Sequence, residues 1–524
     1  MNKIETTSPA RRLGCGHILW QSGWPQKVDA ASRRVKSGWK PLPPWFATKY
    51  GHPQRLRWAV VLTLLLPVGC QSYHGKPLTP EAVTQTLKTP SWRELRVAVK
   101  KTSSEQFPKT MLSPSQAITP ERAAVLALIL NPSLRAIRAA HGEASAQLLQ
   151  AGILTNPVLT SSFGYVTGGF RTGTFNPYGI GVAWSIRQLI DRQARISSAR
   201  YGLKEVDLEV AWREWQTAEA ARLAVYAMAK AKEQLKEALA ARQQLDKTYK
   251  IAQHANRLGL ITLYNLGIAL TASQRAKVLV LTFRQHFERS QLELARAMGL
   301  GPQTVFTLSP KVRLPTAVHL PDVVKLEHKV ANRRLDLLAL HMGYQSQQEQ
   351  LRAAVLRQFP SVSIGFTQNS DPNNVHYTSF GVSIDLPIFD RNQGQIALAK
   401  ATRRALYDDY IARVFAARSD IATAAMNIRS LQRRIRQAQF AVGKYRELVN
   451  RDLQGLRIRS VNIQAYAAAM EQLERERIGL VQLQYRLARN LIALELSSGD
   501  AFFAQHGKPN KPTTTASNNS GDAQ

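Results

Sequence analysis

The chain has 524 residues, of which 44% are hydrophobic and 20% are charged, and its formal net charge is +34. Only two cysteines are present, which excludes a disulfide-stapled scaffold, and the basic charge is diffuse, without the aromatic-and-basic stripe of a nucleic-acid surface. No histidine pair at helical spacing, phosphate-binding loop or nucleophile elbow occurs, so we expect no enzyme, no cofactor, no metal site and no nucleic-acid partner.

Residues 1–69 are expected to be an N-terminal extension that ends in a signal peptide. Residues 58–69 are mostly apolar and follow Arg55 and Arg57. They are too few for a membrane-spanning helix of about 20 residues, but they suit the apolar region of a signal peptide. The stretch resembles a bacterial lipoprotein signal, which implies that Cys70 is lipidated. Pro67 departs from the leucine that is usual there, and the alternative is a cysteine that merely ends an apolar run.

Residues 70–117 are expected to be an irregular lead-in to the first long elements. A helix should then begin with Thr119 as N-cap and Pro120 at its first position, and run to about residue 150 with an interruption at Asn131. Alternating apolar and small residues predict strands at 158–167 and 178–187. A helix over 191–258 follows, Gly259 ends it, and a returning helix covers 262–298.

The same order of elements is expected again about 200 residues later. Helices are predicted at 322–357, 390–454 and 462–497, and strands at 361–369 and 378–386. Asn131 matches Asn332 and Gly259 matches Gly455. These matches predict a two-fold internal repeat, residues 118–310 and 311–500, followed by a disordered tail at 501–524. In each repeat, one long helix should lie beside two shorter helices stacked end to end.

The four strands have the length and alternation of strands that cross an outer membrane at a tilt. Two half-buried hairpins on a soluble core are the alternative, but the chain offers no further apolar layer to cover them. Four strands cannot close a barrel, and an open edge in lipid leaves backbone groups unpaired. Membrane barrels begin at eight strands, so two copies are the minimum and three would give a trimer with a 12-stranded β-barrel. The predicted fold class is therefore mainly α with membrane β, with a long α-helical barrel and four strands per chain.

Several segments resemble the TolC family of outer-membrane efflux proteins. The most specific is LPIFDRNQGQI at Leu386–Ile396, and NPSLRAIRAA, QAGILTNPVL and the turns RLGL and LQGL are also similar. The resemblance implies a homotrimer in outer-membrane lipid, with a helical tunnel in the periplasm. It also implies a periplasmic adaptor (membrane fusion) protein and an inner-membrane pump as partners. The adaptor would contact the hairpin tips at Gly259, Leu260, Gly455 and Leu456.

The resemblance also implies a constriction close to these tips. In the family, acidic side chains shortly after the tip glycines narrow the tunnel and pair with a basic residue. Counted from the glycines, the acidic positions here hold Asn265, Val461 and Gln464, and the basic position holds Arg457. Because the carboxylates are missing, we expect neutral hydrogen bonding to Arg457 in place of a cation-binding ring.

The function predicted from the sequence is a passive exit duct of a tripartite efflux system. The duct would conduct substrates from the adaptor and pump to the outside, as a lipid-anchored protein of the bacterial outer membrane. The alternative is a lipid-anchored periplasmic coiled-coil protein without a channel. The strand pairs argue against this alternative, because a coiled-coil spacer has no need of them.

Overall fold

A computed structural model describes residues 72–88, 117–169, 173–304, 306–458 and 460–501. The chain divides into two compact units, and the described part of the smaller one is residues 72–88. That part contains one helix, α2 (Pro80–Leu87), which Thr79 caps by accepting a hydrogen bond from the Ala82 amide. The lead-in that was predicted to be irregular therefore contains one short helix. Residues 1–69, Cys70 and 502–524 lie outside the described residues.

The larger unit begins with two helices, α4 (Pro120–Leu130) and α5 (Pro132–Gly152). Thr119 caps α4 and Asn131 caps α5, and the two helices meet at an angle of 51°. Strands β1 (Val158–Phe163) and β2 (Tyr178–Ser185) follow, and then helices α6 (Arg187–Arg257) and α7 (Leu263–Met298). The predicted start, interruption and order of elements are confirmed, although β1 is shorter than expected.

The same order recurs in the second half of the unit. Helix α8 (Val323–Lys329), the 3₁₀ turn η1 (Val330–Asn332) and helix α9 (Leu335–Leu356) precede β3 (Ser361–Ser370) and β4 (His376–Asp385). Helices α10 (Gln393–Arg457) and α11 (Ile463–Ser498) complete it. The single helix predicted over 322–357 was wrong, because the chain breaks at Arg333 and Arg334, as it does at Asn131 in the first half.

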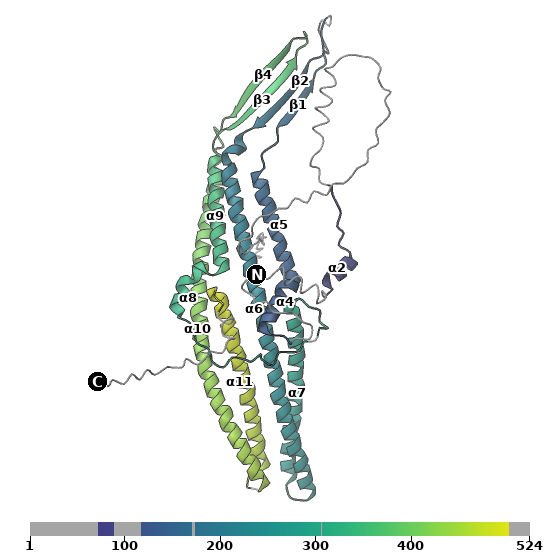
Figure 1. Ribbon diagram of the computed structural model, residues 1–524, viewed down its shortest axis with the longest axis vertical. Helices are drawn as coiled ribbons and strands as arrows, with labels where there is room; N and C mark the ends of the chain where they lie inside the picture. The colour runs from purple at the N-terminus through teal and green to yellow at the C-terminus, as the bar shows by residue number, and fades with distance from the viewer. Residues whose placement is uncertain (1–71, 89–116, 170–172, 305, 459, 502–524) are drawn as a thin grey trace, which may run out of the picture. The chain divides into compact units, whose positions relative to one another are not determined.

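Each long helix packs beside two shorter helices that meet end to end (Figure 1). Helix α6 contacts α4, α5 and α7, and α10 contacts α8, α9 and α11. Gly299 ends α7 with φ +75° directly against the backbone of Leu130 and Asn131, and the Asn131 side-chain Nδ2 donates to the Ala297 carbonyl at 3.3 Å. Gly499 ends α11 with φ +78° against the backbone of Arg333. The predicted stacking is thus present at both junctions.

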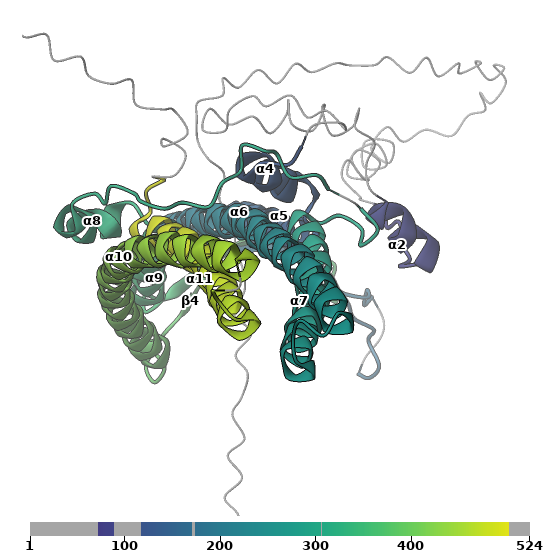
Figure 2. The same cartoon turned by 90° about the horizontal axis from the view of Figure 1, so that it is seen from below.

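The helices of this unit form a curved row. Seen along the long axis, α10 lies at one end of the row and α7 at the other, and α4 and α8 lie on the convex side (Figure 2). Separate small apolar clusters hold the row together along its length: one joins α4, α6 and α7 around Leu126, and another joins α8, α10 and α11 around Ile428. Arg222 of α6, which is buried, reaches Glu219 at 2.6 Å and Glu495 of α11 at 3.1 Å, and so ties the two halves.

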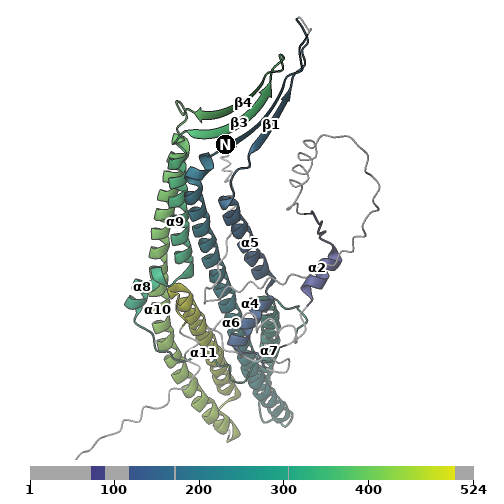
Figure 3. The same cartoon turned by 45° about the horizontal axis from the view of Figure 1, so that its top comes forward.

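The strands form one antiparallel sheet in the order β1-β2-β3-β4. The sheet continues from the ends of the helices, and it curves (Figure 3). The registers place Leu159 opposite Val182, Val182 opposite Phe366, and Phe366 opposite Phe380. Since β2 pairs with β3, the two hairpins are joined within a single chain, and β1 and β4 form the two outer edges.

Candidate functional site

One face of the sheet is apolar over its whole width. Residues that oppose each other in an antiparallel pair project to the same side, so the registers sort the side chains into two faces. This face carries Leu159, Phe163, Tyr178, Ile180, Val182, Trp184, Val362, Ile364, Phe366, Phe380, Val382 and Ile384, together with the polar Ser161, Gln368, Ser370, His376 and Thr378, most of them toward the loop end. Most of these side chains are exposed, Phe380 to 71%. A contiguous apolar face of this size is a surface for lipid or for another protein.

The opposite face consists mainly of glycine and small polar residues. It carries Thr160, Ser162, Gly179, Gly181, Ala183, Ser185, Ser361, Ser363, Gly365, Thr367, Asn369, Ser379, Gly381, Ser383 and Asp385, and also the larger Val158 and Tyr377. A Cβ on Gly179 would come within 2.7 Å of the Ser162 hydroxyl, and one on Gly181 within 2.7 Å of the Thr367 methyl. Glycine is therefore required where this face is crowded, which allows the sheet to curve toward its polar side.

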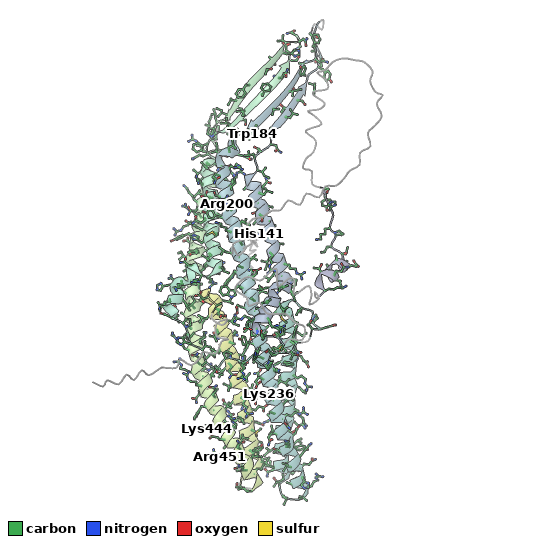
Figure 4. All side chains as sticks on the ribbon, in the orientation of Figure 1. His141, Trp184, Arg200, Lys236, Lys444 and Arg451 are labelled. Carbon is green, nitrogen blue, oxygen red and sulfur yellow. The ribbon has the colours of Figure 1, made fainter. Side chains whose placement is uncertain are left out.

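The dimensions of the sheet suit a bilayer. Strand β4 has ten residues, which extend about 34 Å at 3.4 Å per residue, or about 24 Å along the membrane normal at a 45° tilt. The whole strand is thus about as tall as the apolar band of about 25 Å on outer-membrane barrels, although Thr378 and His376 make the loop end of this face polar in β4. Aromatic rings lie at both ends: Tyr178 contacts His376 at the loop end, and Trp184 donates to the Thr155 carbonyl near the helices (Figure 4).

Both edges of the sheet are open. Within the part of the chain that the structure describes, the outer edges of β1 and β4 have no partner strand. Unpaired backbone groups cost several kcal/mol each in the hydrocarbon region. A single copy of this sheet would therefore leave unpaired backbone groups in the hydrocarbon region of a membrane.

The first helix hairpin has a glycine at its tip, as predicted. Gly259 follows the end of α6 with φ +69°, a conformation in which a side chain would be strained. The Leu260 amide donates to the Ala255 carbonyl at 2.9 Å, and Thr262 caps α7. Leu260, Leu263 and Tyr264 are exposed around the turn, so this tip offers an apolar contact surface.

The second hairpin differs from the prediction. Gly455 is not in the turn but inside the last turns of α10, where it is buried and a Cβ would come within 2.5 Å of Val461. The Ser460 backbone amide donates to the Gly455 carbonyl at 2.8 Å. In the first hairpin, 200 positions earlier, the Leu260 amide makes the equivalent bond to the Ala255 carbonyl. The helix ends also differ by 200, from Arg257 to Arg457. The match of Gly259 with Gly455 was therefore wrong by four positions.

The residues proposed for the constriction lie in the two hairpin ends. Asn265 is half-buried in the first turn of α7, and its amide donates to the Thr262 hydroxyl at 3.3 Å. Gln464 is exposed at the start of α11, Val461 is half-buried, and Arg457 is the last residue of α10. The assignments of Arg457, Val461 and Gln464 were counted from Gly455, so the error of four positions applies to them as well. Leu456, beside Gly455, packs against the apolar cluster of this end.

Sequence reasoning missed an exposed apolar stripe on α10. Tyr407, Ile411, Phe415, Met426 and Phe440 are exposed, and they lie on the side of α10 away from its buried residues. Helical spacing of apolar residues is the signal that could have revealed it, but the sequence does not say which apolar residues a neighbouring helix covers. The stripe lies on the same edge of the chain as β4, and it is a second surface suited to another copy.

Helix α7 is long and apolar enough, by length and composition, to cross a membrane. It packs along α6, whose facing segment carries Lys236, Lys247 and Lys250. The interface itself is polar at one point, where the Ser273 hydroxyl donates to Asp246 at 2.5 Å. Placing this pair in lipid would bury several charges, so α7 is better explained as part of the helical row.

Three comparisons with known proteins bear on the fold. Residues 326–500 match the family model described as outer membrane efflux protein. The solved structure of the outer-membrane channel OprN is 17% identical, has a TM-score of 0.64, and the match covers 76% of this chain and 98% of that one. The outer membrane protein VceC from Vibrio cholerae is 19% identical, with a TM-score of 0.61 and coverage of 73% and 96%.

The outer membrane channel CmeC from Campylobacter jejuni is similar to the same extent. It is 16% identical, has a TM-score of 0.60, and the match covers 83% of this chain and 94% of that one. No curated protein sequence matches this chain. The structural likenesses establish the fold of these channels, and together with the family model they confirm the resemblance drawn from the sequence.

Proposed function

We propose that this chain, whose residues 326–500 carry the outer membrane efflux protein domain, is the outer-membrane exit duct of a tripartite efflux system. The observation that carries the proposal is the sheet with one apolar face, one polar face and two open edges, standing on a curved row of helices. The apolar face would meet lipid and the polar face would line a water-filled passage. The duct would be passive, with no enzymatic step of its own.

The working form would be a homotrimer. Four strands per chain and a minimum of eight for a membrane barrel leave two copies as the smallest solution, and three copies give the twelve strands expected from the family resemblance. The edge that bears β1, α5 and α7 would meet the edge of the next copy that bears β4 and α10. Such a contact joins two different surfaces, so it can repeat around a closed ring.

The remaining partners follow from the same proposal. The exposed leucines at the α6–α7 tip, with Gly259 and Leu260, and the α10–α11 tip with Leu456 would contact a periplasmic adaptor that connects to an inner-membrane pump. Asn265, in the first turn of α7 beside the tip, would line the constriction. Cys70 would anchor the mature chain to the outer membrane through lipid. Residues 118–310 and 311–500 would be the two repeats.

The mass of the protein extracted in detergent from separated outer membranes tests the proposal. Light scattering, with the detergent contribution subtracted, should give three copies, and the same sample should conduct ions when it is reconstituted into planar bilayers. A monomer that leaves the membrane as a peripheral lipoprotein would contradict the duct and would favour the anchored coiled-coil alternative. A trimer without conductance would also contradict it.

A further inference from the structure

A cavity of about 280 Å³ lies between α6, α10 and α11, several helical turns from the hairpin tips. Its apolar wall includes Val449, Met470 and Leu473, and its polar wall includes Glu237 and Glu474. At its base Gln244 of α6 donates to the Tyr466 hydroxyl of α11 at 3.0 Å. Beside it, Met470 and Leu473 of α11 pack with Leu245 of α6 and Val449 of α10 in one apolar cluster, so the cavity lies against the contact of the three helices.

Glu474 is the unusual member of this wall. The residue is only 8% exposed, and its Oε1 atom has no hydrogen-bond partner among the residues that the structure describes. A buried, ionised carboxylate without a partner is costly, whereas the protonated form is neutral. The surroundings of Glu474 thus favour the neutral carboxyl group.

The charges around Glu474 are already engaged with one another. Glu237 of α6 pairs with Arg477 at 3.0 Å, and Glu471 pairs with Arg275 of α7 at 3.3 Å and with Arg475 at 3.6 Å. Arg446 lines the cavity from α10. The pKa of Glu474 is raised to about 7: burial contributes most, Glu471 and Glu237 raise it as well, and Arg475 opposes them.

We propose that Glu474 makes the contact of α11 with α6 and α10 a proton-controlled joint. With a neutral carboxyl group the three helices pack as seen here. Ionisation creates a third negative charge beside Glu237 and Glu471, on a carboxylate whose Oε1 atom has no hydrogen-bond partner among the described residues, and a looser contact of the helices would let water reach that atom. The lower part of α11 then loosens from its neighbours.

The direction of the pH dependence follows from the pKa shift. Because the folded-state pKa of Glu474 lies above the ordinary value of 4.5, its contribution to stability is fully present below pH 4.5 and is lost as the pH rises through about 7. The joint is therefore tighter at pH 6 than at pH 8. An effect on conduction would in addition rest on the proposed function, whereas the joint itself does not.

Amide hydrogen exchange on the full-length wild-type protein in detergent tests the joint. After correction for the intrinsic pH dependence, protection of the peptide spanning 463–478 should fall by up to about tenfold between pH 6 and pH 8. Protection of the α7 peptide spanning 290–298, which is remote from the cavity, should not change. Equal protection of residues 463–478 at both pH values would overturn the proposal.

Two variants isolate the carboxyl group. Glu474→Gln keeps the shape and cannot ionise, so its protection should stay high at both pH values. Glu233→Gln removes an exposed carboxylate of α6 that pairs with Lys236. In this variant the protection of residues 463–478 should fall between pH 6 and pH 8 as it does in the wild type. If protection in Glu474→Gln falls between pH 6 and pH 8 as much as in the wild type, the proposal of a proton-controlled joint is wrong. A normal exchange response in a trimer that does not conduct would instead overturn the duct and leave the joint intact.

Discussion

At the scale of single residues, Phe380 and Gly381 show most directly how one strand serves two environments. They are neighbours in the middle of β4, but Phe380 lies on the apolar face and Gly381 on the small, polar face. A Cβ on Gly381 would meet nothing within 4 Å. The two positions therefore form a matched pair for testing which face meets lipid.

Phe380→Arg should impair insertion, while Gly381→Arg should not. Arginine on the lipid face of a barrel costs about 2–4 kcal/mol near the bilayer centre, and a charge that faces a water-filled lumen avoids that cost. We expect the amount of urea-resistant protein in outer membranes to fall more than tenfold for Phe380→Arg and to stay near wild type for Gly381→Arg. Equal losses in both variants would show that the sheet does not have a lipid face and a lumen face.

At the scale of secondary-structure elements, the glycines that end α7 and α11 fix where stacked helices meet. Gly299 and Gly499 both have positive φ, and in both a Cβ would lie 2.7 Å from backbone atoms of the adjoining break. Backbone cannot yield as a flexible side chain can. Each position thus requires glycine for two reasons: the backbone has a positive φ, and a side chain would clash with the adjoining backbone.

Gly299→Ala should lower the free energy of unfolding by at least about 2 kcal/mol, because alanine adds left-handed strain of about 1–2 kcal/mol and a clash with backbone. Gly267→Ala is the control in α7, because a Cβ at this position would contact nothing within 4 Å. Alanine in place of glycine within a helix should raise the free energy of unfolding by about 0.5–1 kcal/mol. Urea denaturation followed by circular dichroism measures both. A Gly299→Ala variant as stable as wild type would refute this account of the junction.

Most helices and strands could be predicted from periodicity, because long runs with one apolar face leave few other structures open to them. Thr119, Pro120 and Thr262 marked helix starts correctly. The break at Arg333 was missed, since it lacks the Asn-Pro pair that marks the equivalent break at Asn131. Gly455 was wrongly assigned to the turn, because a glycine in a sequence can indicate either a turn or a close contact. Only its packing against Val461 in the structure shows that Gly455 serves a close contact.

The two faces of the sheet could be predicted from the sequence, but the order in which its strands pair could not. Alternation along a strand assigns each side chain to a face, but the pairing of β2 with β3 depends on contacts almost 200 residues apart. The burial of Glu474 likewise depends on three helices that come together. Its spacing from Glu471 is that of an ordinary solvated helix face, so no local signal sets it apart.

At the scale of the whole molecule, the exposed stripe on α10 should hold the copies together. Phe415 is 73% exposed and belongs to the stripe, whereas its neighbour Ala416 is exposed on a different side of the helix. A charge at position 415 would be buried between copies, whereas a charge at position 416 would remain in contact with water.

Phe415→Glu should therefore shift the detergent-solubilised protein from trimer toward monomer while its helical circular dichroism stays unchanged. Ala416→Glu should remain a trimer. Light scattering coupled to size-exclusion chromatography distinguishes the two species. Dissociation of the Ala416→Glu variant, or a trimer of Phe415→Glu as stable as wild type, would place the interface elsewhere on the helices.

The open edges of β1 and β4 also bear on how such a protein is made. A newly exported chain can fold its helices by itself in water, but its sheet has no lipid-compatible form until other chains supply the missing edges. Insertion would then be an encounter-limited step whose rate rises more steeply than linearly with the concentration of exported chains. At low expression, most copies would wait as helical intermediates on the periplasmic side, exposed to proteases, and the yield of finished ducts would show a threshold.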